Sequence, residues 1–342
     1  MSASREKFLV RMLYPVIDRL FPAPLASKIK MCGCILVGDW MIPYNFTSCD
    51  PSYLRNHSSA DIVKKNFPGL SEDASRDMIS YFERLRRLLP TWEDQNFRFQ
   101  IFLKSDFAFS RAELAANRRE DREAIRRGKA YGIDFQRAEA TSLIYHHGLT
   151  LVPEKVLQYI ENKDFIDAGA YDGASCLVFQ QYAPRCVFAF EPSKANQQLF
   201  AQTLNRNRID REKYRLIGKG LADVEGTVAF DDTGDAVNDL SKKGEQLAEI
   251  TTVDLFAKAN NLQIGVIKAD VEGMGLKVIQ GCLETLKNSR PVLLLSVYHH
   301  PDELFGIYNF LFGLSLSYKI FFKPLHRTIN EMTLIAYPEE LS

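Results

Sequence analysis

The part of the chain that begins near residue 150 alternates short apolar runs with helical segments. The apolar runs span residues 165–168, 187–190, 214–217, 265–269 and 292–296. Helical patterns lie near residues 174–183, 193–206, 274–287 and 301–313. Such alternation is typical of β-α-β units, so it predicts an α/β fold built on a parallel sheet.

Two further apolar runs, 318–322 and 333–337, lie at the end of the chain. Only a loop separates them, whereas a parallel crossover needs a dozen or more residues. We therefore predict that they form an antiparallel hairpin that closes the sheet.

Residues 1–140 follow a different pattern, and we predict two units. The first, 1–140, is a mainly helical region that could act as an acceptor-binding or cap unit, and the second is 141–342. Residues 5–21 have helical apolar spacing. This segment is interpreted as a docked helix, with weak peripheral contact with a membrane surface as the alternative.

Two more helices are predicted in this region. One begins after Ser71 as N-cap and stops near Pro90, and the other covers 110–130 with Ser110 as cap. Charges of both signs along the second helix are typical of a solvated face. A phosphate contact through Arg126, Arg127 and Lys129 is the alternative.

The charge balance, the apolar runs and the cysteines argue against three classes of protein: nucleic-acid-binding, membrane-spanning and secreted. The chain has 43 Lys and Arg against 43 Asp and Glu, so no global field favours nucleic acid as a partner. It has no apolar run of about 18 residues, which predicts no transmembrane segment. The start, MSASREKFLV, lacks the apolar core of a signal peptide, and six cysteines form no CxxC pair. We expect a cytoplasmic protein without a metal site; the oligomeric state stays open.

The most specific motif is DFIDAGAYDGAS at residues 164–175. An apolar strand ends at Asp167, and a turn from Gly169 to Gly173 opens a helix whose first N–H groups can meet a polar ligand. Gly169 permits a tight turn and close ligand approach. Helix–strand packing alone is the structural alternative.

A carboxylate follows the next strand. The run VFAFEP places Glu191 before Pro192, 24 residues after Asp167 (191 − 167). An acid at this position can accept hydrogen bonds from both hydroxyls of a ribose. The alternative is a surface glutamate at a strand end.

Three ionisable residues end a later strand. In IKADVEG, Lys268 and Asp270 share one side of the strand, and Glu272 joins them only if the strand continues. Such a cluster at the carboxyl edge is typical of a ligand site. A structural Lys268–Glu272 ion pair is one alternative, and a metal site of Asp270, Glu272 and His299 is another.

Two histidines follow the fifth strand, in SVYHHPD. His299 is placed as a general base, because a histidine titrates near neutral pH. Of His299 and His300, we expect one to be functional and the other to cap the loop.

These motifs together resemble the FkbM-type family of S-adenosylmethionine-dependent methyltransferases over residues 164–338. The matching stretches are DFIDAGAYDGAS, FEPSKANQQLFAQTLNRN, GLADVEGTVAF, IKADVEG and LSVYHHPDEL, with LVPEKVLQYI as lead-in helix. The resemblance implies the Rossmann-like class I methyltransferase fold, a seven-stranded, mostly parallel sheet with a terminal antiparallel hairpin. It also implies S-adenosylmethionine as cofactor and, usually, O-methylation of sugars or natural products.

The resemblance also implies where the cofactor would lie. Its methionine part would lie over the glycine turn, and its ribose would meet Glu191 and Pro192. The adenine would lie near Gly220 and Leu221, and Asp270 would face the amino group or the methyl. The turn contributes the residues Asp167, Gly169, Ala170, Tyr171, Gly173 and Ser175.

The resulting prediction is an O-methyltransferase that acts on a hydroxyl of a saccharide, glycan or natural-product acceptor. His299 would remove the proton, Asp270 or Glu272 would orient it or the acceptor, and Lys268 would complete the catalytic set. An NAD-dependent oxidoreductase is the rival, but Gly169 and Gly173 do not form G-x-G-x-x-G. The other rival is an inactive methyltransferase-like module in a glycan-assembly complex, which the intact acid set disfavours.

Overall fold

The computed structural model describes residues 41–43, 49–93, 101–103, 111–130, 147–230, 246–325 and 331–342. The predicted helix at 5–21 and the predicted cap Ser110 lie outside these ranges.

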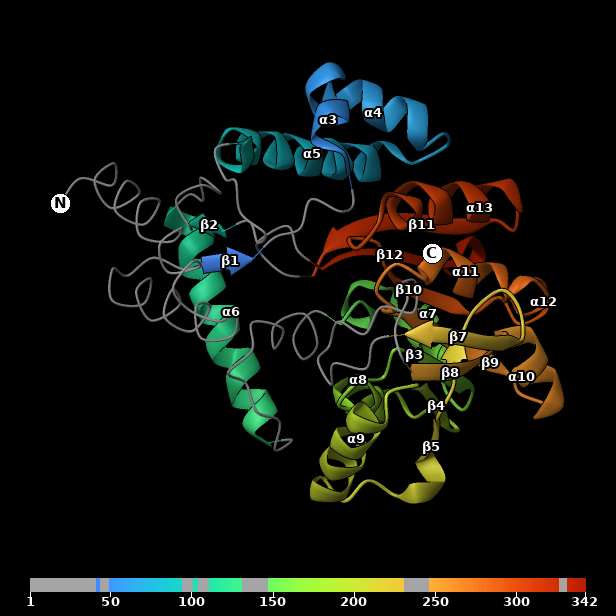
Figure 1. Cartoon of the computed structure of the whole chain (residues 1–342). Helices are drawn as coiled ribbons and strands as arrows, with labels where there is room; N and C mark the ends of the chain where they lie inside the picture. Colours follow the sequence, from blue (N-terminus) through green and yellow to red (C-terminus); the bar gives the residue numbers. More distant parts are fainter. Residues whose placement is uncertain are drawn as a thin grey trace.

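A seven-stranded sheet, seen near its edge in Figure 1, forms the centre of the C-terminal half, in the order β11-β12-β10-β9-β3-β4-β5. Its first five strands in sequence are parallel, and β12 is antiparallel to β10 and β11. The strands are β3 Asp164–Ala168, β4 Val187–Phe190, β5 Tyr214–Ile217, β9 Ile264–Ala269, β10 Val292–Ser296, β11 Tyr318–Pro324 and β12 Met332–Pro338. All seven predicted strands and the terminal hairpin are confirmed, and with them the class I methyltransferase fold.

Helices cover both faces of this sheet, because its central strands are apolar on both sides. In β3, Phe165 packs in one hydrophobic cluster and Ile166 in the other. The Phe165 side is covered by α7 Glu154–Ile160, α8 Ala174–Phe179 and α9 Lys194–Arg206. The Ile166 side is covered by α10 Val253–Ala259, α11 Gly275–Gln280, α12 Leu283–Asn288, the π-helix η6 Asp302–Ile307 and α13 Tyr308–Gly313.

A second, three-stranded sheet was not predicted. It has the order β6-β8-β7, with β6 Gly220–Leu221, β7 Gly226–Phe230 and β8 Gln246–Thr251. It lies between β5 and β9 in the chain. Its strands are short and half exposed, so their apolar spacing is weak.

Three N-terminal helices, α3 Pro51–Asn56, α4 Ser59–Asn66 and α5 Glu72–Glu93, lie over β11 and α13 in Figure 1. Phe67 anchors them: its ring lies 5.2 Å from the rings of both Tyr308 and Phe322. The hydroxyl of Tyr308 donates to the carbonyl of Pro68 at 2.6 Å. These helices therefore share one hydrophobic core with the sheet. The boundary at residue 140 stays a prediction.

The predicted start of α5 is confirmed, since Ser71 Oγ accepts a hydrogen bond from Ala74 N at 3.3 Å. The predicted stop near Pro90 is wrong, because the helix continues to Glu93. The turns before Pro90 bury Leu85, Leu88 and Leu89 in the shared core. This packing offsets the backbone hydrogen bond that a proline cannot donate.

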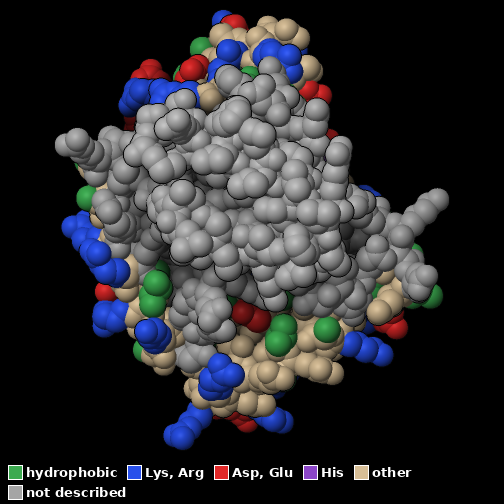
Figure 2. Space-filling view, turned by 60° about the vertical axis from the view of Figure 1, so that its left-hand side comes forward, with side chains coloured by type: hydrophobic (Ala, Val, Ile, Leu, Met, Phe, Trp, Pro, Cys, Tyr) green, Lys and Arg blue, Asp and Glu red, His purple; other side chains and the backbone are tan. Residues whose placement is uncertain are grey.

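The remaining described elements are α6 Arg111–Ala130 and the pair β1 Met41–Pro43 and β2 Ile101–Leu103. On α6, Arg126 and Arg127 both contact Glu123, at 2.7 and 2.9 Å, as expected of a solvated face. In Figure 2 the visible Lys and Arg side chains are spread around the rim of the described surface. Among the described helices, none has the length and apolarity that a membrane crossing requires.

Candidate functional site

The polar residues that the sequence singles out meet at one edge of the sheet. Strands β3, β4, β9 and β10 are parallel neighbours, so the loops after them leave at the same edge. In open α/β sheets this carboxyl edge is where ligands bind. The structure brings the glycine turn, Glu191, Lys268, Asp270 and His299 to this edge.

At the glycine turn, the backbone of Gly169 packs directly against the backbone of Asp270 in the β9 loop. Gly169 has φ +76°, and a Cβ there would lie 2.0 Å from the carbonyl oxygen of Asp270. The positive φ confirms the predicted tight turn, and the missing side chain also makes room for the backbone of the β9 loop; the predicted ligand approach stays a prediction. The amides of Gly169 and Ala170 donate to the carbonyl of Phe190 at 3.0 and 3.1 Å. The turn is thereby bound to both neighbouring strands.

The helix after the turn begins at Gly173, which has φ +83°. A Cβ there would lie 2.5 Å from the side chain of Leu204, so α9 packs directly on this residue. Asp172 accepts a hydrogen bond from Ala174 N at 3.1 Å and satisfies one of the free amides of α8. Ala170 and Ser175 are buried, while Tyr171 is half-buried.

Glu191 binds the glycine turn through its carboxylate. Its Oε2 accepts from Tyr171 N at 3.0 Å, and its Oε1 accepts from Ser193 N at 2.9 Å. The residue is buried, and burial raises the pKa of its carboxyl although these amides oppose the shift. Glu191 is therefore no free surface glutamate. Each oxygen has two lone pairs, so the carboxylate can accept further hydrogen bonds.

The predicted adenine contacts lie in the second sheet. Gly220 and Leu221 pair with Ile250 and Thr251 of β8. The side chain of Leu221 is buried in the main core, so only its backbone can line a ligand site. The half-buried Pro192 follows Glu191 directly.

Lys268 pairs with Asp167 and not with Glu272, the partner considered from sequence. Its Nζ lies 3.2 Å from Asp167 Oδ1 and donates to the carbonyl of Gly169 at 2.9 Å. Burial lowers the pKa of Lys268, but the charges of Asp167 and Asp270 outweigh it, and the net pKa is raised. Lys268 is therefore a half-buried cation that holds the glycine turn. Asp167 is fully buried behind it.

A cavity opens beside Lys268, between α8 and strands β9, β10 and β12. It presents charged groups of both signs, Lys268 and Asp270, above an apolar floor. Its lining residues are His147, Ser175, Val178, Phe179, Lys268, Asp270, Leu294, Ser296, Leu325, Glu331 and Thr333. The predicted placement of Lys268 and Asp270 on one side of the strand is confirmed, since both reach this cavity.

On the other side of Asp270, three carboxylates surround His299. Its Nε2 lies 3.5 Å from Asp270 Oδ1 and 3.3 Å from Glu272 Oε1, and its Nδ1 lies 3.1 Å from Glu303 Oε2. The imidazole is 9% exposed. Its two nitrogens thus face carboxylates from two segments, the β9 loop and η6.

These three carboxylates favour the protonated form of His299. Burial lowers its pKa, but the hydrogen bonds to Glu272 and Glu303 and the charge of Asp270 outweigh burial, and the net pKa lies well above the usual value. With Nδ1 on Glu303 and two further carboxylates within 3.5 Å of Nε2, the ring is held as an imidazolium, which has no acceptor nitrogen. The geometry therefore does not support the general-base role that the sequence assigns to His299.

His300 lies outside this cluster. Its side chain is 54% exposed, and its Nδ1 accepts a hydrogen bond from Asp302 N at 3.2 Å. It caps its own loop, as expected for one of the two histidines.

Sequence reasoning missed Glu303. It is fully buried on η6, four residues after His299. A signal was present, because residues four apart share one face where a helix begins. The helical pattern near 301–313 did not by itself distinguish Glu303 from its neighbour Asp302 as a partner of His299. Within the described ranges, no group of three or more His, Cys, Asp or Glu has the arrangement of a metal site.

Comparisons with known proteins give a family. The methyltransferase FkbM domain matches residues 167–321. A methyltransferase FkbM structure from Methylobacillus flagellatus KT aligns at 19% identity and a TM-score of 0.44, over 59% of this chain and 50% of that chain. An rRNA methylase from Streptococcus thermophilus aligns at 10% identity and a TM-score of 0.35, over 60% and 99%. A comparison with curated proteins found no match.

The chain spans about half the length of the Methylobacillus protein that it resembles. The family match begins at Asp167 and ends at Phe321 in β11. It includes the glycine turn, Glu191, the β9 loop and both histidines. Residues 167–321 therefore match the methyltransferase FkbM domain, and this match contains the site.

Proposed function

We propose that this protein is an S-adenosylmethionine-dependent O-methyltransferase whose acceptor is a hydroxyl of a saccharide, glycan or natural product. The observation that carries the proposal is the single edge at which the glycine turn, Glu191 and Asp270 meet, inside the matched methyltransferase domain.

The residues at this edge fit the proposed cofactor. The cavity beside α8 offers an ammonium, Lys268, and a carboxylate, Asp270, which complement the α-carboxylate and α-ammonium of a methionine moiety. On the other side of the glycine turn, Glu191 retains acceptor capacity for ribose hydroxyls. We assign the methionine part to the former region and the ribose to the latter.

When bound, S-adenosylmethionine supplies an electrophilic methyl group on a sulfonium centre. The protein's contribution is alignment of the two reactants and removal of the hydroxyl proton. We assign proton removal to Asp270 or Glu272, because both carboxylates reach the partly open side of the cluster. His299 supports them as a cation, and Lys268 holds the glycine turn.

Calorimetry with S-adenosylmethionine and, separately, with NAD tests the cofactor. We expect binding of the first and none of the second. Glu191 would suit the ribose of either cofactor, but Gly169 and Gly173 do not form the G-x-G-x-x-G motif of NAD-binding proteins. Binding of NAD alone would favour the oxidoreductase, and binding of neither would favour an inactive module. A screen of saccharide and glycolipid acceptors with a radiolabelled methyl donor then tests the acceptor class.

A further inference from the structure

The buried carboxylate of Glu303 interacts with both the β9 loop and His299. Its Oε1 accepts hydrogen bonds from Gly273 N at 3.1 Å and Gly275 N at 2.9 Å. Its Oε2 meets His299 Nδ1 at 3.1 Å. A carboxylate is costly to bury unless it is paired and hydrogen-bonded. Glu303 meets both conditions only because the β9 loop and His299 are in their present positions.

The β9 loop has a backbone that needs such support. Glu272 has φ +49° and Gly273 has φ +97°. A residue other than glycine in this region costs about 1–3 kcal/mol and persists when its surroundings hold it. A Cβ on Gly275 would lie 2.8 Å from Glu303 Oε1, so the carboxylate is in direct contact with the loop. The conformation that directs Glu272 at His299 is thus held from behind by Glu303.

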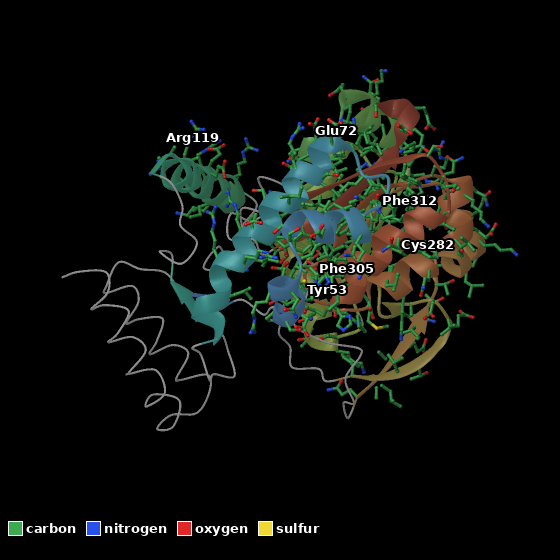
Figure 3. The ribbon with its side chains drawn as sticks, turned by 90° about the horizontal axis from the view of Figure 1, so that it is seen from above. Tyr53, Glu72, Arg119, Cys282, Phe305 and Phe312 are labelled. Carbon is green, nitrogen blue, oxygen red and sulfur yellow. The ribbon has the colours of Figure 1, made fainter. Side chains whose placement is uncertain are left out.

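The element that carries Glu303 is itself anchored on its far side. Phe305, two residues later on η6, has its ring 5.6 Å from Phe67 and 6.4 Å from Phe82. In Figure 3, Phe305 and Tyr53 lie side by side, and their rings are 6.4 Å apart. The N-terminal helices thereby fix the π-helix, and a π-turn is often found at functional sites.

We propose that Glu303 is a positioning residue of the methyl-transfer site, which holds His299 and the β9 loop so that Asp270 and Glu272 face the reactants. This inference rests on the proposed function. The groups that face His299 are Asp270 and Glu272 from the β9 loop, Glu303 from η6 and the adjacent ring of Tyr298 at 3.9 Å. Glu303 accepts a hydrogen bond from Nδ1 of His299, and Nε2 then lies on the side of Asp270 and Glu272, at 3.5 and 3.3 Å.

The test compares Glu303→Gln with wild type in the full-length chain. The amide has the same shape and its oxygen can still accept from the loop, but it lacks the charge that holds the imidazolium. Glu303→Asp keeps the charge with a shorter reach, and Asp302→Asn changes an exposed neighbour as the matched control. Histidine-selective NMR titration gives the pKa of His299, whose signal is assigned by its loss in His299→Gln. Calorimetry gives the affinity for S-adenosylmethionine.

We expect Glu303→Gln to lower the protonation constant of His299 at least tenfold and to weaken S-adenosylmethionine binding at least threefold. Glu303→Asp should restore part of both, and Asp302→Asn should change neither. An unchanged His299 titration in Glu303→Gln would overturn the inference, as would a lowered pKa with unchanged affinity. If the wild type binds no S-adenosylmethionine, the proposed function fails, while the titration still decides whether Glu303 holds His299.

Discussion

The two ends of the carboxyl edge differ in the groups that balance their carboxylates. At the β3–β4 end, backbone amides of Tyr171 and Ser193 satisfy the buried carboxylate of Glu191. At the β9–β10 end, Asp270, Glu272 and Glu303 converge on His299, and the proton on its ring balances them. Amides do not titrate, so the partners of Glu191 keep their charge state as the pH changes. The second end depends on one titratable cation.

The strongest way to break this comparison is to remove that cation. His299→Ala leaves the acids without the cation that orients them, so we expect turnover to fall by about 10–100-fold, in line with roughly 1.5–3 kcal/mol for hydrogen bonds between charged groups. His300→Ala should have little effect, because its ring is largely exposed. Single-turnover methylation, with the acceptor found in the screen, measures both. Greater sensitivity of His300 would contradict the assignment.

The rigid end is best tested at Gly169. Gly169→Ala adds a Cβ at 2.0 Å from the Asp270 carbonyl and requires φ +76°. We expect a loss of about 3 kcal/mol in the free energy of unfolding, from strain and overpacking together. Gly273→Ala is the matched control: its φ is +97°, but nothing lies within 4 Å of the new Cβ. It should cost about 1 kcal/mol. Equal losses in urea denaturation would show that backbone approach is not the cause.

Glu191→Ala sharpens the functional side of the same end. Loss of the ribose acceptor should weaken S-adenosylmethionine binding by roughly 1.5–3 kcal/mol, the range for hydrogen bonds to a charged group. Glu339→Ala changes an exposed acid far along the chain and should leave affinity unaltered. Calorimetry of both variants decides, and unchanged affinity in Glu191→Ala would refute the ribose assignment.

A smaller effect should appear in the pH dependence of stability. The pKa of His299 is raised in the folded state, so its stabilisation is complete below the unfolded value of about 6.5. It is lost as pH rises through the folded pKa. A tenfold difference in protonation constant between the folded and unfolded states corresponds to about 1.4 kcal/mol. Urea denaturation between pH 6 and 9 should show this loss in wild type and not in His299→Gln. Parallel curves would indicate a histidine with an ordinary pKa.

Periodicity along the chain was enough to predict the main sheet and its terminal hairpin. Buried parallel strands such as β3 and β10 are continuous apolar runs, and the short loop before β12 excludes a parallel crossover. The three short strands of the second sheet were missed, because half-exposed strands have weak patterns. The stop at Pro90 was misplaced, because tertiary packing of Leu88 and Leu89 overrode a local rule.

The sequence was enough to predict which residues gather at the site, but not which of their side chains interact with one another. Strand ends and glycine spacing pointed to Asp167, Glu191, Lys268, Asp270 and His299 at one edge. Which acid pairs with Lys268 depends on side chains from strands about 100 residues apart, so local spacing offered Glu272 as an alternative and did not point to Asp167. Glu303 was missed because its importance comes from the loop that it supports.

The sequence by itself determined the strands of the main sheet, the edge at which the polar residues gather and the resemblance to the methyltransferase FkbM domain. These follow from hydrophobic periodicity and from motifs that are local in the chain. Only the tertiary structure decided the charge state of His299, because that state depends on three carboxylates brought together from the β9 loop and η6. Electrostatic energies depend on distance and burial in three dimensions, and neither quantity is encoded in the spacing of residues along the chain.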